Sequence, residues 1–528
     1  MALTKSCAEI IADDTTGLLT IHPSWQRVRL DEVARVLNGF AFDSGFFNAA
    51  QGAPLVRIRD ILTGTTETRF SGDYDEQFMV QAGELLIGMD GDFHCARWKG
   101  APALLNQRVC KITPNESLYS GRLLAYLLPG YLEAVNAATS SITVKHLSSR
   151  TVEGLELPLP PLAEQGRIAE TLEAMLSDLD AGTAELHAAR RKLIVYRQSV
   201  LKAAVEGSLT AGWRDEVCAG ESTEPETGEQ LLKRILFERR AQWEVTQLAR
   251  FKQQGKVAPA GWESRYPLPG QGVPIELRTL PNGWVWASVD QLSPDDLSNG
   301  RSVPSADGGA KVLRLTAVKG GKIDLSEAKE GDWTVAEAAQ FVVTEGDLLI
   351  VRGNGSLPLV GRAGLVSKVT APVAYPDTLI RLRVLNAFVR PAWVGLCWDS
   401  QAVRTHFEGR ARTSAGIYKI SQPDIRSVCI PVPPLAEQDE ILRLFDACMD
   451  GLATTQAALA AAGRVAAAQR RNLLKCAFSG QLVPQDPADE PAPALLARIQ
   501  AARAAQATAQ APKSRPRPPA SRTRTSAC

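Results

Sequence analysis

One segment of this 528-residue chain occurs twice, and this repeat constrains the fold more than any other feature. The phrase Pro-Pro-Leu-Ala-Glu-Gln at Pro160–Gln165 returns unchanged at Pro433–Gln438. Each copy then runs into a phrase of the form Leu-Lys-x-Ala-x-x-Gly-x-Leu, at 201–209 and at 474–482. The repeating unit is far longer than the unit of a solenoid. The chain therefore consists of two copies of one large unit.

The matched segment is predicted to form one long helix in each copy. Its apolar residues recur in alternating steps of four and three, which is the spacing of a heptad seam, and a Pro-Pro start suits a helix N-terminus. A bundle core is the alternative for one such helix alone, but two copies in one chain favour pairing with each other. The second helix must run back along the first, so the pairing is expected to be antiparallel. The seam residues are Ile168, Leu172, Met175, Leu179, Gly182, Leu186, Ala189, Leu193, Tyr196 and Val200 in the first copy, and Ile441, Phe445, Cys448, Leu452, Thr455, Leu459, Ala462 and Ala466 in the second.

A globular block precedes each helix, and the two blocks match more loosely. Trp25 corresponds to Trp284, and Gly83–Ile87 corresponds to Gly346–Ile350. Short strand-like runs alternate with turns rich in Gly, Pro and Asp, which indicates an α/β block. The predicted fold is thus α/β, with two globular blocks separated by two long antiparallel coiled-coil helices in an internal pseudo-two-fold repeat. The expected divisions are an N-terminal extension (1–23), the first block (24–157), the central spacer helix (158–210), a helical insert and linker (211–281), the second block (282–430), the C-terminal spacer helix (431–482), and a helical trailer with a basic tail expected to be disordered (483–528).

The composition narrows the cellular setting. The chain has 59 Lys+Arg against 58 Asp+Glu, so no bulk positive charge attracts nucleic acid or membrane, and any polyanion binding must come from local patches. Nine cysteines without a Cys-x-x-Cys pair favour a reducing compartment. No apolar stretch is long enough to span a bilayer. We expect a soluble, cytoplasmic protein without a membrane partner.

Catalytic signatures are largely missing. No phosphate-binding Gly-x-x-x-x-Gly-Lys-Ser/Thr loop occurs, nor an Asn/Asp-Pro-Pro-Tyr/Phe stretch that grips an extruded base, and the five histidines lack metal spacing. No catalytic residue, cofactor site or metal site is therefore expected. One alternative stays open: Asp295, Glu327 and Lys329 follow the Pro-Asp…Glu-x-Lys pattern of metal-dependent nucleases. Their polar, turn-like surroundings favour a solvated loop.

Binding chemistry appears just before each long helix. Residues 404–419 contain four cations with hydroxyl groups and only one acid, and residues 139–150 are likewise basic and rich in hydroxyls. Arg and Lys neutralise phosphates, while small hydroxyl residues let a backbone approach a duplex. Either stretch alone could be an ordinary solvated loop, but their corresponding positions favour DNA binding. The candidate residues are Lys145, His146 and Arg150 in the first block and Arg404, Arg410, Arg412 and Lys419 in the second.

A second candidate surface follows the matched Gly-Glu/Asp-Leu-Leu-Ile strands. The strand frames agree while the loops after them differ, as expected for two readers of different base sequences. Arg pairs with guanine, Asn with adenine, and acids with the cytosine amine. Loop drift without function would look the same. The candidate residues are Met89, Asp92, Arg97 and Lys99 in the first block and Arg352, Asn354 and Arg362 in the second.

The whole pattern resembles the specificity subunit of type I restriction-modification systems. The resemblance is carried by Leu157–Gln165 and Ile430–Gln438, each placed between a variable block and a long helix, and it covers roughly 24–242 and 282–482. Gly88–Asp92 and Leu105–Arg108 also resemble loops of the target-recognition domains of this family. The 211–281 insert and the basic tail are less typical in length, so the resemblance leaves their roles open.

The resemblance implies that each block is a target-recognition domain for one half of a split, asymmetric sequence of double-stranded DNA. The two helices would act as a spacer and as the docking surface for two methyltransferase subunits, with restriction/translocase subunits joining them. This chain would be non-catalytic and carry no cofactor, and S-adenosylmethionine would bind to the methyltransferase partner. A coiled-coil scaffold without a role on DNA is a further alternative.

Overall fold

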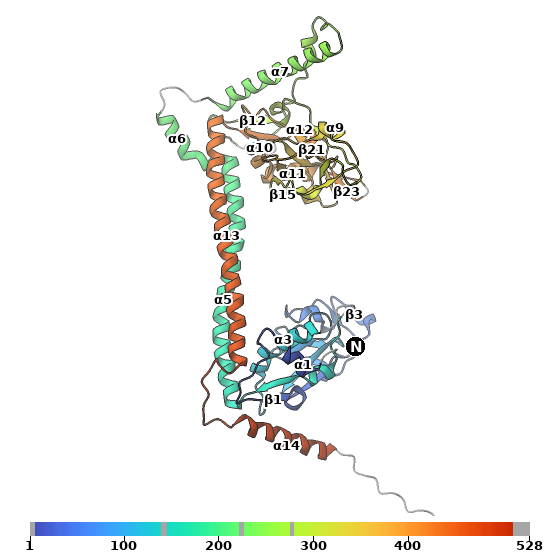
Figure 1. The fold of residues 1–528 in the computed structure, drawn as a ribbon, viewed down its shortest axis with the longest axis vertical. Helices are drawn as coiled ribbons and strands as arrows, with labels where there is room; N and C mark the ends of the chain where they lie inside the picture. Colours follow the sequence, from blue (N-terminus) through green and yellow to red (C-terminus); the bar gives the residue numbers. More distant parts are fainter. Residues whose placement is uncertain (1–5, 139–144, 221–225, 275–278, 415, 511–528) are drawn as a thin grey trace, which may run out of the picture. The chain divides into compact units, whose positions relative to one another are not determined.

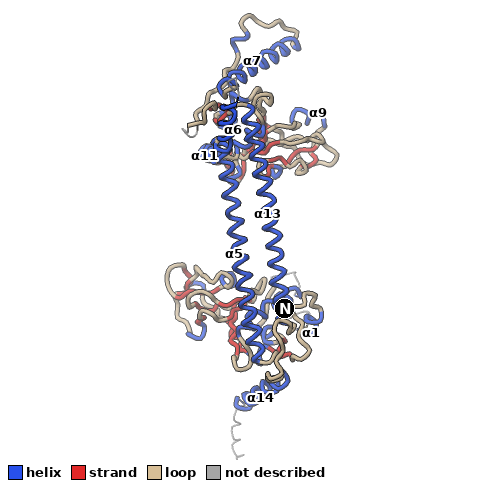
Figure 2. Tube along the Cα trace, turned by 90° about the vertical axis from the view of Figure 1, so that its left-hand side faces the viewer, coloured by secondary structure: helices blue, strands red, loops and turns tan. Residues whose placement is uncertain are grey.

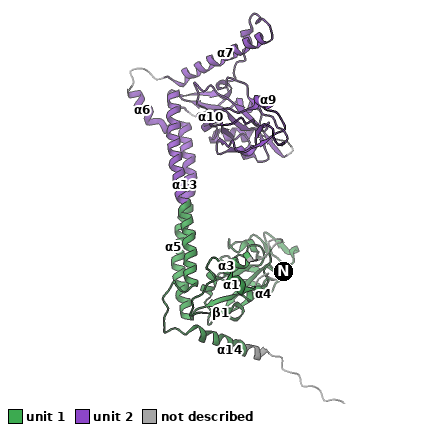
Figure 3. Ribbon diagram, in the orientation of Figure 1, with its two compact units in different colours: residues 1–187, 460–528 green, residues 188–459 purple. Residues whose placement is uncertain are grey.

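The computed structural model describes residues 6–138, 145–220, 226–274, 279–414 and 416–510, which form two compact units. Unit 1 comprises residues 1–187 and 460–528, and unit 2 comprises residues 188–459 (Figure 3). Each unit holds one globular block together with part of each long helix. No helix among the described ranges has the length and apolar character needed to cross a membrane.

Unit 1 contains three sheets. A four-stranded antiparallel sheet in the order β2-β10-β7-β8 forms its centre, and β7 is buried along its whole length. A second sheet has five strands in the order β3-β5-β4-β9-β6. In the third sheet, β1 pairs with β11. The strands are β1 (Gln26–Arg29), β2 (Ala34–Asn38), β3 (Phe47–Asn48), β4 (Ala53–Val56), β5 (Arg69–Phe70), β6 (Met79–Val80), β7 (Leu85–Gly88), β8 (Cys95–Arg97), β9 (Ala103–Leu105), β10 (Val109–Pro114) and β11 (Glu156–Leu159). The helices of the block and its trailer are α1 (Cys7–Ala12), α2 (Leu30–Val33), α3 (Gly121–Ala138), α4 (Ser149–Glu153) and α14 (Ala492–Gln510).

Unit 2 is organised around a six-stranded sheet in the order β13-β21-β18-β20-β16-β15, with β18 buried throughout. Smaller sheets join β12 to β24, β14 to β17, and β19 to β23 and β22. The strands are β12 (Val285–Ser288), β13 (Ser298–Asn299), β14 (Lys311–Leu313), β15 (Val318–Lys319), β16 (Lys322–Ile323), β17 (Ala328–Glu330), β18 (Leu348–Val351), β19 (Gly353–Asn354), β20 (Ala363–Leu365), β21 (Leu379–Leu382), β22 (Arg412–Ser414), β23 (Ile417–Lys419) and β24 (Cys429–Val432). The helices of the block are α8 (Val289–Leu292), α9 (Val335–Ala338), α10 (Pro391–Trp398), α11 (Gln401–Arg410) and α12 (Gln422–Arg426).

The two units repeat the same framework, as the sequence predicts. β1 pairs antiparallel with β11 in unit 1, and β12 pairs antiparallel with β24 in unit 2 (Figure 1). In both units a short helix follows the first of these strands, and the second strand leads directly into a long helix. The predicted α/β fold with an internal repeat is confirmed.

The two long helices are α5 (Leu162–Glu206) and α13 (Leu435–Phe478), and each unit holds part of both, lying side by side (Figures 1 and 2). In unit 1, Arg470 pairs with Asp180 at 2.5 Å, while Arg167 near the start of α5 pairs with Asp489 beyond the end of α13. In unit 2, Arg190 donates to the Leu459 carbonyl. As the residue numbers rise along α5, the numbers of the residues that it contacts on and beyond α13 fall. The predicted antiparallel pairing is therefore confirmed.

The predicted seam is buried best where the helices meet the blocks. Ile168, Leu172, Ile441 and Leu452 are buried, and Leu179, Leu186, Leu193, Phe445 and Leu459 are partly buried. The prediction is wrong for Met175 and Tyr196, which are 44% and 48% exposed, and also for Gly182, Thr455 and Ala462, which are exposed. In this part of unit 1 the core takes Leu176 instead, because the helix must turn its face toward the block as well as toward its partner.

The repeated Pro-Pro-Leu-Ala-Glu-Gln phrase ties each long helix to its block through buried hydrogen bonds. Glu164 accepts from the Trp25 indole at 3.2 Å, and Glu437 accepts from the Trp284 indole at 2.8 Å. The following glutamines, Gln165 and Gln438, are fully buried, and each bridges two backbone segments of its own unit. Buried polar groups need such partners. The phrase therefore has the same structural role in both copies, which is to bind the start of the long helix to its block.

The glycine after each long helix packs against the tryptophan that binds the glutamate at the start of the other long helix. Gly207 has φ +77° and Gly480 has φ +71°, a backbone conformation that other residues adopt only with strain. A Cβ on Gly207 would lie 2.9 Å from the Trp284 ring, and one on Gly480 would lie 3.0 Å from the Trp25 ring. The repeated glycine thus closes the joint between helix and block.

The insert extends unit 2 by two helices, α6 (Ala211–Gly220) and α7 (Gly228–Gln253). An ion pair joins Glu229 to Lys233 one turn later in α7, at 2.9 Å. After α7 the chain returns along it, and Trp262 stacks on Trp243 with ring centroids 5.6 Å apart. The basic tail beyond Gln510 lies outside the described residues.

Candidate nucleic-acid interface

In unit 1 the described end of the basic stretch 139–150 meets the candidate loop that follows β7. The turn after β7 is tight, because Gly91 has φ +75° and Phe93 has φ +53°. Across from it, Leu147 donates its backbone N–H to the Met89 carbonyl at 2.7 Å, and a His146 ring nitrogen lies 2.6 Å from Asp90. Residues some 55 positions apart in the chain therefore form one surface.

A cleft of about 510 Å³ opens beside this turn. Arg108 extends into an ion pair with Asp90 at 3.5 Å, and the buried Nε of Arg57 has no hydrogen-bond partner among the described residues. Positive and negative groups alternate here, which suits the donors and acceptors of base edges as well as phosphates. The residues lining the cleft are Arg57, Ile58, Arg59, Asp90, Gly91, Asp92, His94, Asn106 and Arg108.

Sequence reasoning placed Asp92 at this surface but missed three cations of the cleft. Arg57 and Arg59 follow β4, and Arg108 precedes β10. They come together only because β4 pairs with β9, and the chain after β9 turns back past the end of β7. The resemblance of Leu105–Arg108 to loops of the family was a signal in the sequence for Arg108. No sequence motif pointed to Arg57 or Arg59.

Several candidate residues of the first block have other local partners. Met89 is buried, with 6% of its surface exposed. Arg97 donates to the carbonyls of Gly83 and Gly121, at the end of β7 opposite to the cleft. Lys145 donates to Asn136, Lys99 lies beside Gly64, and Arg150 is exposed on α4. The rest of the first basic stretch, residues 139–144, lies outside the described residues.

Unit 2 builds the same arrangement with different side chains. Arg352 takes the place of Met89: its N–H donates to the Thr378 carbonyl at 2.8 Å, as that of Met89 donates to the Arg108 carbonyl at 2.9 Å. Its carbonyl accepts from the N–H of Ile420, as that of Met89 accepts from Leu147. The frame is common to both units, while the side chains that it presents differ.

The basic stretch of unit 2, residues 404–419, joins this surface through a small sheet. β19 pairs with β23, so Gly353 lies opposite Lys419 and Asn354 opposite Tyr418. Asn354 and Arg352 are partly exposed, and Lys419 and Arg412 are exposed, so their polar groups can reach a ligand. Both surfaces predicted for the second block are thus brought together.

The remaining candidate cations of the second block bind other groups of the chain itself. Arg404 donates to the carbonyls of Val360 and Pro358, and burial together with neighbouring Arg362 lowers its pKa. Arg362 donates to the Pro358 carbonyl and is otherwise exposed. Arg410 contacts the His406 ring at 3.1 Å, and burial lowers the pKa of His406. These contacts order the surface around Arg352 and Lys419.

The residues of the nuclease alternative are engaged in separate local contacts. Glu327 accepts from Lys319 at 2.8 Å and from Thr316 at 2.9 Å, and the Lys319 ammonium holds the pKa of its carboxyl below the ordinary value. Lys329 donates to the Val303 carbonyl and to Ser305. Within the described part of the chain no three His, Cys, Asp or Glu side chains gather as metal ligands would.

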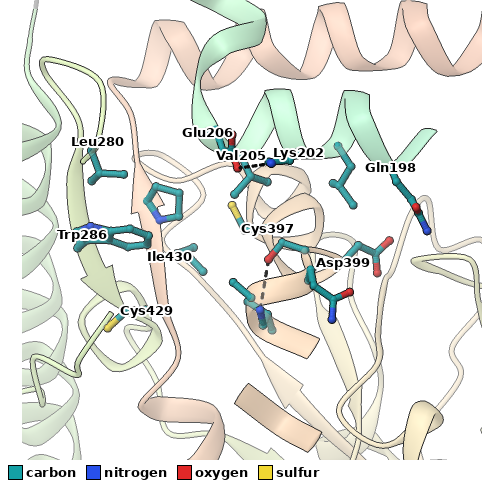
Figure 4. Close-up of a pocket in the computed structure, with 16 residues that line it drawn as sticks. Gln198, Lys202, Val205, Glu206, Leu280, Trp286, Cys397, Asp399, Cys429 and Ile430 are labelled. Carbon is teal, nitrogen blue, oxygen red and sulfur yellow. Dashed lines mark hydrogen bonds and ion pairs between the residues drawn. The ribbon is translucent and has the colours of Figure 1, made fainter. Parts of the chain in front are cut away.

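Unit 2 also has a pocket of about 500 Å³ between the end of α5 and the start of α11 (Figure 4). Lys202, Trp286, Asp399 and Cys429 are among the residues that line it. Burial raises the pKa of Asp399, which lies 3.9 Å from Arg197.

The corresponding surface of unit 1 is covered by the N-terminal segment. Lys475, the counterpart of Lys202, lies against Gly17, and the Glu156 N–H, the counterpart of that of Cys429, donates to the Cys7 sulfur. Arg27, in the position of Trp286, donates to the Leu19 carbonyl. The N-terminal extension therefore belongs to the unit 1 core, and we assign this flank to packing.

Comparison with known proteins agrees with this framework. The family described as type I restriction modification DNA specificity domain matches residues 23–194. The chain is 32% identical over 520 residues to the type I restriction enzyme EcoBI specificity subunit of Escherichia coli, covering 96% of this chain and 98% of that protein. It is 27% identical over 405 residues to the EcoKI specificity subunit of Escherichia coli strain K12, covering 75% and 74%.

A solved structure described as showing complex assembly and conformational transition of the type I R-M system shares the fold, with a TM-score of 0.55 and 19% identity over 88% of this chain and all of that chain. The repeated framework, the paired long helices and the near full-length match lead to one conclusion. The chain belongs to the family of type I restriction enzyme specificity subunits.

Proposed function

We propose that this chain reads a bipartite DNA target, with one half contacted by each block. The observation that carries the proposal is the pair of equivalent surfaces, Met89–Asp92 with His146 in unit 1 and Arg352–Asn354 with Lys419 in unit 2. Their backbones make the same hydrogen bonds while their side chains differ. A common frame with different readers suits recognition of two unlike half-targets, because base edges are distinguished by donor and acceptor pattern.

The two long helices serve as the spacer that sets the gap between half-targets, and as the docking surface for two methyltransferase subunits. Linking two weak contacts makes the second one intramolecular, which raises the affinity for a split target without new contacts. The chain itself is non-catalytic, with S-adenosylmethionine bound by the methyltransferase partner and with restriction/translocase subunits joining the complex. Its near-zero net charge fits a reader whose partners supply much of the phosphate clamp.

A block exchange combined with mapping of methylated adenines tests this function. Cells that carry the methyltransferase partner, with and without this chain, are expected to differ by one split motif. Replacing residues 24–157 with the block of a relative should change one half of that motif and keep the other half and the gap. An unchanged motif would instead support a scaffold without a role on DNA. Full cleavage by a complex that carries Glu327→Gln would dismiss the nuclease alternative.

A further inference from the structure

An Asn-Gly pair lies at the end of the edge strand of each block's central sheet, β2 or β13. Asn38-Gly39 ends β2, and Asn299-Gly300 ends β13. The Gly39 N–H donates to the Val109 carbonyl at 2.9 Å, and the Gly300 N–H donates to the equivalent Leu379 carbonyl at 3.3 Å. The two pairs therefore occupy the same place in the two blocks.

Glycine is required at both places by close backbone contact. A Cβ on Gly39 would lie 2.0 Å from the Asn106 carbonyl oxygen, and one on Gly300 would lie 2.1 Å from the Tyr375 carbonyl oxygen. No side chain fits in that space. The backbone at each glycine therefore lies in direct contact with the loop before β10 in unit 1 and before β21 in unit 2. This contact fixes the position of the next residue beside that loop.

That next residue is Phe40 in unit 1 and Arg301 in unit 2. The Phe40 N–H donates to the Leu105 carbonyl at 2.9 Å, and the Arg301 N–H donates to the equivalent Tyr375 carbonyl at 3.2 Å. The framework is therefore the same up to the backbone of these residues, and only their side chains differ. One is a flat apolar ring and the other is a cation with five donors.

Both side chains are available to a ligand. The Phe40 ring is 50% exposed although Phe42 and Phe78 lie 5.2 Å from it on two sides, so it is supported without being covered. Arg301 is exposed, and its guanidinium forms no hydrogen bond or ion pair with another described residue. Arg301 is close enough to Glu337 to help lower the pKa of that carboxyl. An exposed phenylalanine packed on two rings, and an exposed arginine whose guanidinium is bonded to no described residue, are side chains suited to contact with another molecule.

The backbone of Phe40 is bonded to a loop that lines the unit 1 cleft. The Gln107 N–H donates to the Phe40 carbonyl at 2.9 Å, and the preceding Asn106 lines the cleft together with Arg57 and Arg108. A duplex that places a base edge against these groups would bring a neighbouring base against the Phe40 ring.

We propose that Phe40 and Arg301 are specificity-determining residues, each reading one base pair of its own half-target. Arg301 donates to O6 and N7 of a guanine in the major groove, and Phe40 makes apolar contact with the methyl group of a thymine. This inference rests on the proposed function, and it names residues and base chemistry that the function alone does not.

The test uses the full chain assembled with its methyltransferase partner and a pool of DNA duplexes randomised across both half-targets. A bidentate Arg–guanine contact is worth about tenfold to a hundredfold in discrimination. Arg301→Ala should lower the preference for guanine at one position of one half by about that factor, and Arg301→Gln should shift the preference there toward adenine. Phe40→Arg should introduce a guanine preference at one position of the other half, while Phe40→Leu should keep the thymine preference.

Two exposed residues outside the proposed surface supply matched controls. Phe46 is also 50% exposed, but it precedes β3, at the far edge of its sheet from β9, so Phe46→Arg should leave the motif unchanged. Lys368 is an exposed cation that follows β20, at the end of β18 opposite to Arg352, so Lys368→Ala is the control for Arg301→Ala. An equal loss of methylation on every sequence, with the motif unchanged in both Arg301 variants and in Phe40→Arg, would overturn the inference. If the unaltered chain directs no split motif at all, the proposed function itself fails.

Discussion

Replacing Glu437 with alanine removes the carboxylate that joins α13 to the second block. The Glu437 side chain is 1% exposed and accepts hydrogen bonds from the Trp284 indole at 2.8 Å and from Thr210 at 2.7 Å. It also forms an ion pair with Arg214, whose side chain is 20% exposed. The substitution therefore leaves a buried indole N–H without its acceptor and a mostly buried cation without its counter-charge, although Arg214 still donates to the Gly207 carbonyl at 2.7 Å.

The expected cost follows from what is left unpaired. Breaking a buried ion pair by removing one partner costs about 3 to 5 kcal/mol, because the remaining charge stays desolvated. Among the residues that the structure describes, the equivalent Glu164 accepts from Trp25 and from Gln485, which is exposed and can turn to water. Glu164→Ala should thus cost about 1 to 3 kcal/mol, the range for an unsatisfied buried donor. We expect unit 2 to lose about 2 kcal/mol more than unit 1.

Native-state hydrogen exchange can measure the two units separately within one chain. Backbone amides of β12 and β24 should lose protection in Glu437→Ala, and those of β1 and β11 should lose less in Glu164→Ala. Asp446→Ala, which removes an exposed carboxylate from the same helix α13, is the control and should change little.

A loss below about 1 kcal/mol in unit 2, or equal losses in the two units, would refute the buried-charge argument. A double-mutant cycle with Arg214→Met adds an independent check. Because the methionine removes the charge that Glu437→Ala leaves stranded, the double variant should be more stable than Glu437→Ala alone.

Three further outcomes are expected. Burial raises the pKa of Glu164, so its contribution to unit 1 stability is full below the ordinary glutamate pKa and is lost as pH rises through the raised value; urea titrations should show this slope in the unaltered chain and not in Glu164→Gln. Deleting residues 1–19 uncovers apolar surface that Leu18 and Leu19 now bury, so the melting temperature of unit 1 should fall by several degrees in calorimetry while that of unit 2 stays unchanged. Arg108→Ala should weaken DNA binding by the assembled complex, with the loss confined to one half-target if Arg108 reads a base and equal on all sequences, with a shallower salt dependence, if it binds a phosphate.

Sequence periodicity and repetition were sufficient for the framework of this protein. Heptad spacing predicted α5 and α13, and the two copies of the matched segment predicted that they pair antiparallel. These inferences succeed because a long helix with one apolar stripe has few ways to bury it. The end regions were less predictable: Met175 fits the heptad but lies exposed, since contact with the block competes with contact between the helices.

The repeated Glu-Gln phrase could be recognised from the sequence, but its purpose could not. The Pro-Pro start indicated a helix N-terminus, but only the structure shows that Glu164, Gln165, Glu437 and Gln438 are among the most buried polar residues described. Their partners, such as Trp25 and Trp284, lie more than a hundred residues away in the chain. Local pattern contains no information on such distant hydrogen bonds.

The chain's two-fold architecture, its long paired helices and its family follow from the order of residues alone, because repetition and periodicity are properties of the sequence itself. Which cations share a surface was decided by strand pairing: β4 beside β9 brings Arg57 and Arg59 to Arg108, while β8 carries Arg97 to the other end of β7. Side chains separated by tens of residues meet only when a sheet closes between them, and the order of strands in a sheet is set by the packing of the whole block.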